Sequence, residues 1–296
     1  MQIVQPDFSR FESIEDFPYK ENFIRFDNLQ MHYIDEGQGE TILALHGEPT
    51  WSYLYRKFIP ILKNYRFIAP DLIGFGKSDK IVGYKNYSFD LHFKSLENLI
   101  QKLDLNDITL VVQDWGGILG LSLLAEYPEK FKRVVILNTF LPVGKKMSFF
   151  FKIWRAYAKY HPSLSIPSIL KHGSYQKLSQ EVLQAYNAPF PNKKHKGGAV
   201  AFPLLVPANV NDPAVKPIQK ARDVLSKWQK PALVLFSDKD KILGGLEKFF
   251  YRLIPSSAEQ QKIIIKNAGH FLQEEKGEEI AQYIDQFMKD ELKIIT

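Results

Sequence analysis

The chain has 296 residues, 45% of them hydrophobic and 14% aromatic, which is enough for one large α/β domain with a substantial core. It contains no cysteine, and this excludes disulfides, thiolate metal sites and a cysteine nucleophile. The formal charge of +6, from 39 basic and 33 acidic residues, comes mostly from scattered lysines. The densest basic cluster, Lys193–Lys196, is more typical of a solvated loop than of a nucleic-acid-binding surface.

The first residues carry no recognisable targeting signal. The segment Met1–Glu21 mixes charges and prolines and lacks the basic and apolar regions of a signal peptide. No apolar run approaches the ~18 residues that a membrane-spanning helix needs. We therefore expect a soluble, cytoplasmic protein that binds neither nucleic acid nor membrane and exists as a monomer or weak homo-oligomer.

The first half of the chain alternates between strand and helix patterns. Short apolar runs bounded by turn residues predict strands, and apolar residues spaced three and four apart predict helices. The expected elements, in chain order, are a hairpin at 23–26 and 29–34, a strand at 41–45, a helix at 53–62, a strand at 66–69, a helix at 88–103, a strand at 109–113, a helix at 116–126 and a strand at 133–138.

The pattern changes between Thr139 and about Arg222, where prolines and aromatics multiply and strand signals fade. Strands and helices then return, with strands at 232–237 and 261–265 and a last helix near 278–292. Alternating strands and helices predict a mostly parallel sheet with helices on both faces. We therefore predict an α/β core domain of residues 1–139 and 223–296, with a helical cap of residues 140–222 inserted over the ligand-binding ends of the strands.

Asp114 lies at the turn between the predicted strand 109–113 and a helix that opens with Gly116 and Gly117. A strand, a sharp turn and a helix are the parts of a nucleophile elbow. The general motif also has a glycine two residues before the nucleophile, where this chain has Val112. A carboxylate on this turn cannot perform serine acyl transfer, but it can attack a saturated carbon and form a covalent ester.

A nucleophilic carboxylate needs a base that releases the ester. His270 follows a late strand and a glycine turn, which fits the order nucleophile, acid, histidine of this kind of elbow. The acid should follow strand 232–237, where we favour Asp240 and hold Asp238 in reserve. Its role would be to fix the tautomer of the histidine and to stabilise the imidazolium.

Two further turns follow predicted strands. The backbone N–H groups of Glu48 and Trp115 are expected to form an oxyanion hole for ester hydrolysis. His46 is expected to hold the turn around Glu48 through ring hydrogen bonds. The segment Asp71–Ser78 lacks the ending of a phosphate-binding loop, so it is expected to be a structural turn. No set of His, Asp and Glu residues has metal-ligand spacing, and we expect neither a metal nor a cofactor.

At these residues the chain resembles the haloalkane dehalogenases of the α/β-hydrolase superfamily, and within them the subgroup typified by the dichloroethane-degrading enzyme. In that subgroup a residue other than glycine two positions before the nucleophile is normal. The stretches that carry the resemblance are 46–56, 71–79, 111–117, 185–191 and 268–274.

The resemblance implies hydrolysis of haloalkanes to a primary alcohol and halide, a detoxification chemistry. Asp114 would be the nucleophile that forms an alkyl–enzyme ester, His270 the general base that activates water, and Asp240 the acid behind it. Asn138 lies where a second subgroup keeps its acid, and this favours Asp240. The partners would be a small apolar halogenated substrate, a halide ion and water.

The departing halide carries a full charge into an apolar pocket, where indole N–H groups are suitable donors. Trp115 is expected to supply one. A second subgroup has an asparagine donor at the position of Glu48, and a carboxylate there would repel halide. The resemblance therefore implies a second tryptophan in the cap, and Trp154 is the only one in that segment. Trp51 and Trp228 are expected to be structural.

Two alternatives remain open. An epoxide hydrolase uses the same Asp–His–Asp triad and needs two cap tyrosines, and the cap contains Tyr157, Tyr160, Tyr175 and Tyr186. Gln113 stands where epoxide hydrolases usually have histidine, which disfavours this alternative. The second alternative is a non-catalytic binding protein with the hydrolase fold, and the complete triad argues against it.

Overall fold

A mostly parallel sheet of eight strands organises the part of the chain that the structure describes, residues 1–144, 149–160 and 164–293 of a computed structural model. The strand order is β10-β9-β8-β7-β4-β5-β3-β2. All pairs from β10 to β5 are parallel, whereas β3 pairs antiparallel with β5 and with β2. These strands are β2 (Asn22–Phe26), β3 (Leu29–Glu36), β4 (Thr41–Leu45), β5 (Arg66–Pro70), β7 (Ile108–Gln113), β8 (Phe131–Leu137), β9 (Ala232–Ser237) and β10 (Ile263–Ile265), and a separate pair joins β1 (Ile3–Val4) to β6 (Lys80–Ile81).

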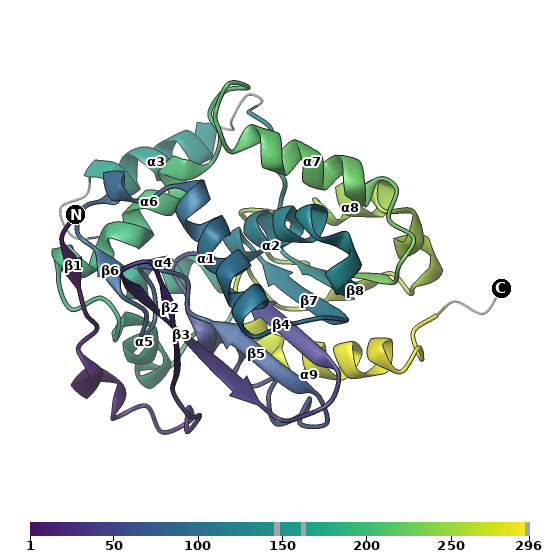
Figure 1. Cartoon of the computed structure of the whole chain (residues 1–296), viewed down its shortest axis with the longest axis horizontal. Coiled ribbons are helices and arrows are strands. Elements are labelled where there is room, and N and C mark those ends of the chain that lie inside the picture. Colours follow the sequence, from purple (N-terminus) through teal and green to yellow (C-terminus); the bar gives the residue numbers. More distant parts are fainter. Residues whose placement is uncertain (145–148, 161–163, 294–296) are drawn as a thin grey trace.

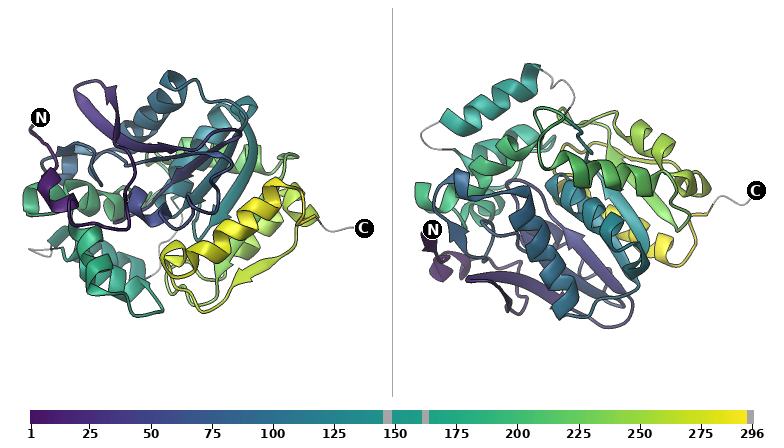
Figure 2. Two further views of the ribbon diagram at one scale, coloured as in Figure 1. Left: turned by 90° about the horizontal axis from the view of Figure 1, so that it is seen from below. Right: turned by 45° about the horizontal axis from the view of Figure 1, so that its top comes forward.

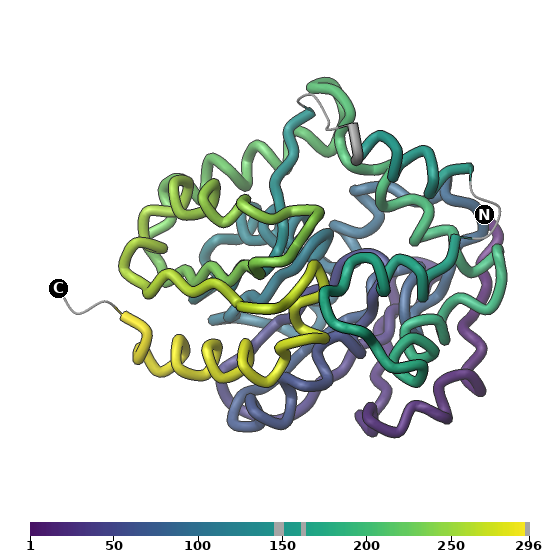
Figure 3. Tube along the Cα trace, turned by 180° about the vertical axis from the view of Figure 1, so that it is seen from behind, coloured from purple at the N-terminus to yellow at the C-terminus, as the bar shows by residue number. Residues whose placement is uncertain are grey.

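Helices cover both faces of this sheet. The helices α1, α2 and α7 lie on one face (Figure 1), and α9 crosses the other face, in yellow in the view from behind (Figure 3). Because both faces are covered, β4, β7 and β9 are buried at every residue and are mostly apolar. The helices of the core are α1 (Phe89–Lys102), α2 (Trp115–Glu126), α7 (Val215–Leu225), α8 (Glu247–Leu253) and α9 (Leu272–Met288).

Four further helices lie together at the end of the molecule opposite the C-terminus, as both views of Figure 2 show. They are α3 (Phe149–Tyr160), α4 (Ile166–Gly173), α5 (Gln180–Asn187) and α6 (Gly197–Leu205). They occupy the segment predicted as the cap, of which residues 145–148 and 161–163 lie outside the described residues, as do core residues 294–296. Because α7 packs against α2 of the core, we propose that the cap ends before Val215 rather than at 222.

The α/β-hydrolase fold predicted from the sequence is confirmed, but two helix predictions were wrong. Residues 53–62 do not form an α-helix; a 3-10 turn, Ser52–Tyr55, is followed by further tight turns. Seven of these ten residues are buried, and the segment contains Pro60, which is exposed and cannot donate a backbone hydrogen bond. The last helix begins at Leu272, earlier than predicted, and has a break at Lys276.

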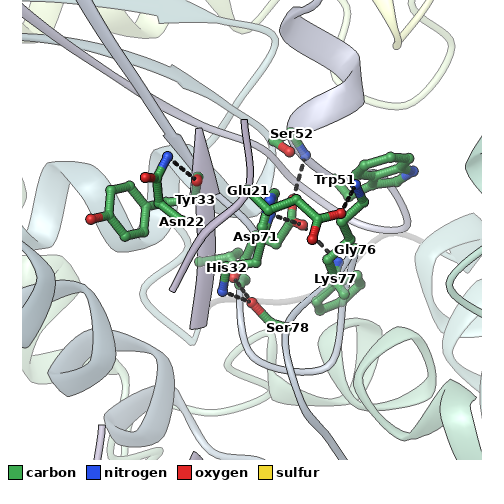
Figure 4. A network of polar contacts seen from close by, with 12 residues as sticks. Glu21, Asn22, His32, Tyr33, Trp51, Ser52, Asp71, Gly76, Lys77 and Ser78 are labelled. Atoms are coloured by element: carbon green, nitrogen blue, oxygen red, sulfur yellow. Dashed lines mark hydrogen bonds and ion pairs between the residues drawn. The ribbon is translucent and has the colours of Figure 1, made fainter. Parts of the chain in front are cut away.

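The turn that follows β5 is held by a buried network around Asp71 (Figure 4). One carboxylate oxygen accepts the backbone N–H of Ser52 at 2.7 Å, and the other contacts His32 Nδ1 at 2.8 Å and the N–H of Lys77 at 2.7 Å. Burial alone would raise the pKa of Asp71, but His32 and the hydrogen bonds outweigh burial and lower that pKa. The segment Asp71–Ser78 is therefore a structural turn, as predicted.

In the described part of the chain, none of the helices is both long enough and apolar enough to cross a membrane.

Candidate active site

Asp114 occupies a strained turn between β7 and α2. Its φ of 48° and ψ of −122° are unusual for any residue with a side chain. The turn is held by the N–H of Asp114, which donates to Asn138 O at 3.0 Å, and by Thr139 Oγ1, which donates to Asp114 O at 2.6 Å. A Cβ at Gly116 would overlap the carbonyl oxygen of Leu45, so the start of α2 can approach β4 only with glycine there.

Val112 replaces the first glycine of the general elbow motif, and Gly120 makes room for it. A Cβ on Gly120 would lie 2.7 Å from Val112 Cγ1, closer than side chains tolerate. In the general motif the small residue that lets strand and helix pack closely is on the strand. Here it is Gly120 on the helix, about one turn into α2. The sequence analysis did not identify Gly120, because only the packing of α2 on β7 pairs it with Val112.

The backbone N–H of Glu48, predicted to be one oxyanion donor, lies at the carboxylate of Asp114. It donates to Asp114 Oδ1 at 2.9 Å. The turn is tied down by His46, whose Nδ1 contacts Gly47 O at 2.9 Å while its Nε2 accepts the N–H of Leu72 at 2.9 Å. His46 therefore joins two loops in its neutral form, and burial lowers its pKa.

The protonation state of the Glu48 side chain differs from the charged carboxylate expected from the sequence. Burial, together with the charge of Asp114, raises its pKa well above the ordinary value. The neutral carboxylic acid is therefore favoured, and the expected repulsion of a halide ion by Glu48 disappears. Trp115, whose backbone N–H was the second expected oxyanion donor, directly follows the nucleophile and is the first residue of α2.

His270 lies between two carboxylates. Its Nδ1 is 2.9 Å from Asp240 Oδ2, and its Nε2 is 3.6 Å from Asp114 Oδ2, which is an ionic contact beyond hydrogen-bond distance. Burial alone would lower the pKa of His270, but the charges of Asp240 and then Asp114 outweigh burial and raise that pKa to about 10.

The two candidate acids have separate positions. Asp240 faces the imidazole, and its other oxygen accepts the N–H groups of Ile242 at 2.7 Å and Leu243 at 3.1 Å. His270 and these donors lower the pKa of Asp240 against the effect of its burial. Asp238 instead accepts the N–H of Asn267 at 2.8 Å and so holds the turn that precedes the histidine.

Asn138 braces the histidine loop rather than the imidazole. Its Nδ2 donates to Ser237 Oγ at 2.7 Å and to Gly269 O at 3.1 Å, and its Oδ1 accepts the N–H of Ser237 at 3.0 Å. The amide therefore ties together the ends of β8 and β9 and the turn before His270.

A cavity of about 630 Å³ lies above these groups. Asp114, Glu48 and His270 line it from the core, and α3, α4 and α6 line it from the cap. Most of the remaining lining residues are apolar or aromatic, which fits a small apolar ligand. They are Trp115, Phe140, Phe151, Trp154, Tyr157, Ile169, Pro203, Val206, Ile242, Leu243 and Phe271, with Ser168, His172, Gly173 and Lys241.

A family model described as the alpha/beta hydrolase fold matches residues 40–277. A haloalkane dehalogenase from Psychrobacter cryohalolentis is 43% identical over 98% of this chain and 99% of its own length. The chain belongs to the haloalkane dehalogenase family. The solved tetrameric structure of haloalkane dehalogenase DpaA from Paraglaciecola agarilytica superimposes with a TM-score of 0.88 at 36% identity, over 96% of this chain and 97% of that chain.

A more distant relative is named for a different activity. The cis-3-alkyl-4-alkyloxetan-2-one decarboxylase of Shewanella oneidensis is 31% identical over 94% of this chain and 91% of its own length. The family resemblance inferred from the sequence is confirmed, and the full-length matches to dehalogenases leave no large segment of the chain outside the comparison.

The positions of the four tryptophans bear on which indoles could bind a halide. Trp115 and Trp154 both line the cavity, where Trp115 stacks on Phe202 with ring centroids 4.6 Å apart. Trp51 is fully buried elsewhere and donates its indole N–H to a backbone carbonyl at 3.2 Å. Trp228 is also buried and does not line the cavity.

The cap tyrosines do not converge as an epoxide hydrolase requires. Of the four, Tyr157 alone lines the cavity. Tyr160 and Tyr175 are 72% and 54% exposed, and the hydroxyl of Tyr186 donates to Glu274 at 2.7 Å. In the described residues, a pair of cap tyrosines that could bind an epoxide oxygen is therefore missing.

No cluster of three or more His, Asp or Glu side chains within residues 1–144, 149–160 and 164–293 is arranged to hold a metal ion.

Proposed function

We propose that the chain hydrolyses the carbon–halogen bond of haloalkanes through an ester on Asp114. The observation that supports this most strongly is the position of the Asp114 carboxylate. It lies on a strained turn at the floor of an apolar cavity, with one oxygen bonded to the Glu48 N–H and the other 3.6 Å from His270 Nε2. A carboxylate so placed is a nucleophile for saturated carbon with its base at hand.

In the first step, an oxygen of Asp114 forms a bond to the carbon as the carbon–halogen bond breaks and the halide leaves with its electron pair. Oδ2 is the attacking oxygen in our proposal, because Oδ1 is already bonded to the N–H of Glu48. Oδ1 then becomes the ester carbonyl oxygen. Negative charge develops on this oxygen in the second step, so the Glu48 N–H is aimed at the correct atom.

In the second step, His270 Nε2 takes a proton from water while the water oxygen bonds to the ester carbonyl carbon. The ester on Asp114 removes one of the two charges that raise the pKa of His270, and Asp240 fixes the neutral tautomer in which Nδ1 carries a proton and Nε2 is free to accept one. Collapse of the tetrahedral intermediate breaks the bond to the alkoxide oxygen, which takes the proton held on His270 Nε2 and leaves as the alcohol, and the carboxyl proton left on Asp114 is then released. One proton and one halide ion are released in each turnover.

Two indoles, those of Trp115 and Trp154, are proposed to bind the halide as it leaves. They line one cavity from opposite domains, Trp115 from α2 of the core and Trp154 from α3 of the cap. An anion in a largely apolar cavity needs such donors, because an unpaired charge there is costly. The proposed partners are a small apolar haloalkane, halide and water, and sedimentation would test whether the chain is a monomer or weak homo-oligomer.

The decisive experiment uses His270→Gln with excess 1-bromobutane. Wild-type enzyme should release bromide continuously. The variant should release one bromide per active site and then stop, with a butyl group on the peptide that carries Asp114, because displacement needs no base and ester hydrolysis does. Halide is measured by ion chromatography and the ester by mass spectrometry of the peptide.

The matched control is His172→Gln, a histidine of α4 that lines the same cavity and contacts Ser168 O through Nδ1. It should keep turning over. Continued turnover by the His270 variant would remove that residue from the mechanism. Absence of halide release by the wild type, together with turnover of an epoxide or a 3,4-dialkyl β-lactone, would overturn the proposed function.

A further inference from the structure

Gln113 is the polar side chain nearest to the reacting nitrogen of the proposed base. It is the last residue of β7 and is fully buried. Its Nε2 lies 3.1 Å from His270 Nε2 and 3.3 Å from His270 O. The nucleophile is farther from that nitrogen, with Asp114 Oδ2 at 3.6 Å. The other amide atom of Gln113, Oε1, is buried without a hydrogen-bond partner among the described residues.

The position of the amide has a chemical consequence because His270 Nε2 changes role during the reaction. Nδ1 is bound to Asp240, so neutral imidazole presents a lone pair at Nε2, and imidazolium presents an N–H there. A carboxamide can donate through its nitrogen or accept through its oxygen, and a half turn about its last bond exchanges the two. The unpartnered Oε1 is the group that this half turn would place at Nε2.

We propose that Gln113 is a positioning residue that follows the proton on His270. Its amide donates to Nε2 of the neutral ring and, after a half turn, accepts the Nε2–H of the imidazolium formed during ester hydrolysis. The inference rests on the proposed function, because it assigns a role within that second step. Gln113 does not reach the substrate, since it is fully buried and does not line the cavity.

The two chemical steps should therefore respond differently to the loss of this amide. Displacement of halide leaves His270 unchanged, so it does not need Gln113. Ester hydrolysis creates a buried N–H, and Asp114 Oδ2, which lies 3.6 Å from Nε2 in the free enzyme, carries the alkyl group at that stage. The loss of one hydrogen bond at this point corresponds to roughly a tenfold slower step. The alkyl ester should therefore accumulate.

The pH dependence gives a readout that a purely structural role would not affect. The charged or titratable groups that face His270 are Asp240 after β9, Asp114 after β7 and Glu48 after β4. All three remain in a Gln113 variant. A hydrogen bond to a charged partner is stronger than one to a neutral partner, so removal of the amide disfavours the imidazolium. The pH below which ester hydrolysis slows should then be lower than in the wild type.

The test is a single-turnover quench experiment on full-length Gln113→Met and Gln113→Glu with 1-bromobutane across a pH series. Bromide reports displacement and butanol reports hydrolysis. For the methionine variant we expect displacement within about twofold of wild type, hydrolysis slowed roughly tenfold, and an acid limb at lower pH. For the glutamate variant, which has the same shape, an added acidic acceptor should move the acid limb to higher pH.

The control is Gln273→Met, which removes another fully buried glutamine, three positions after His270 on α9. It should leave the ratio of the two steps unchanged. Equal slowing of both steps in Gln113→Met, or acid limbs that do not move in either Gln113 variant, would refute the proposal. If the methionine variant does not fold, the shift in Gln113→Glu decides alone. Absence of bromide release from the wild type would instead refute the proposed function.

Discussion

The cap is fastened to the core by a buried hydrogen bond whose removal gives a quantitative test of the fold. Tyr186 of α5 donates its hydroxyl proton to Glu274 Oε2 of α9 at 2.7 Å. Glu274 also binds Arg56 in bidentate fashion, at 2.6 and 2.8 Å. All three side chains are almost completely buried, and burial followed by the charge of Glu274 raises the pKa of Tyr186 well above its ordinary value.

The substitution Tyr186→Phe removes this one hydrogen bond and keeps the ring. Glu274 remains paired with Arg56, so no buried charge is left alone. Hydrogen bonds to charged groups contribute about 1.5–3 kcal/mol, and we expect a loss of about 2 kcal/mol. For a chain of this size, a loss of that magnitude lowers the melting temperature by roughly 3 °C.

The assay is equilibrium urea denaturation at neutral pH, followed by tryptophan fluorescence and circular dichroism, with thermal melting as a second measure. The control is Tyr160→Phe, which is the same chemical change in the cap at a side chain that is 72% exposed. That variant should stay within about 0.5 kcal/mol of wild type. If the two variants unfold at the same denaturant concentration, the latch formed by Tyr186, Glu274 and Arg56 does not stabilise the cap in the way that its geometry indicates.

Three further predictions concern the site. Trp154→Phe should weaken bromide binding and bromide quenching of fluorescence far more than Trp228→Phe, because only the former indole lines the cavity; equal effects would discard the assignment. Asp240→Asn should slow ester hydrolysis by roughly three to four orders of magnitude and lower the pKa of the base, whose raised pKa depends on the Asp240 charge, so the acid limb should move to lower pH. Asp238→Asn, measured beside it, should change the rate less than tenfold, and the reverse ranking would exchange the two residues. Gly120→Ala should destabilise the protein by about 1–3 kcal/mol in urea denaturation, because its Cβ would meet the side chain opposite at 2.7 Å; an unchanged midpoint would show that α2 can shift freely.

The elements that carry the proposed nucleophile could be predicted because their signals are local. A nucleophile elbow is a strand, a sharp turn and a helix, and the residues of all three lie between 109 and 126. The strand Ala232–Ser237 was predicted with its observed bounds, and α1, Phe89–Lys102, differs by one residue at each end from the helix predicted at 88–103. By contrast, the prediction of a helix at residues 53–62 was wrong. Seven of these ten residues are buried, including Arg56, so their apolar spacing carried little information about which face is exposed.

The amino-acid sequence by itself determined the family, the strand–helix alternation and the presence of Asp114 and His270 on turns after strands, because periodicity and turn chemistry are properties of neighbouring residues. Only the tertiary structure decided that Asp240 rather than Asp238 faces the imidazole, and that Gln113 approaches Nε2. The physical reason is that these contacts join residues far apart in the chain. Their distances depend on how separate loops pack at one edge of the sheet, and spacing along the sequence does not contain that geometry.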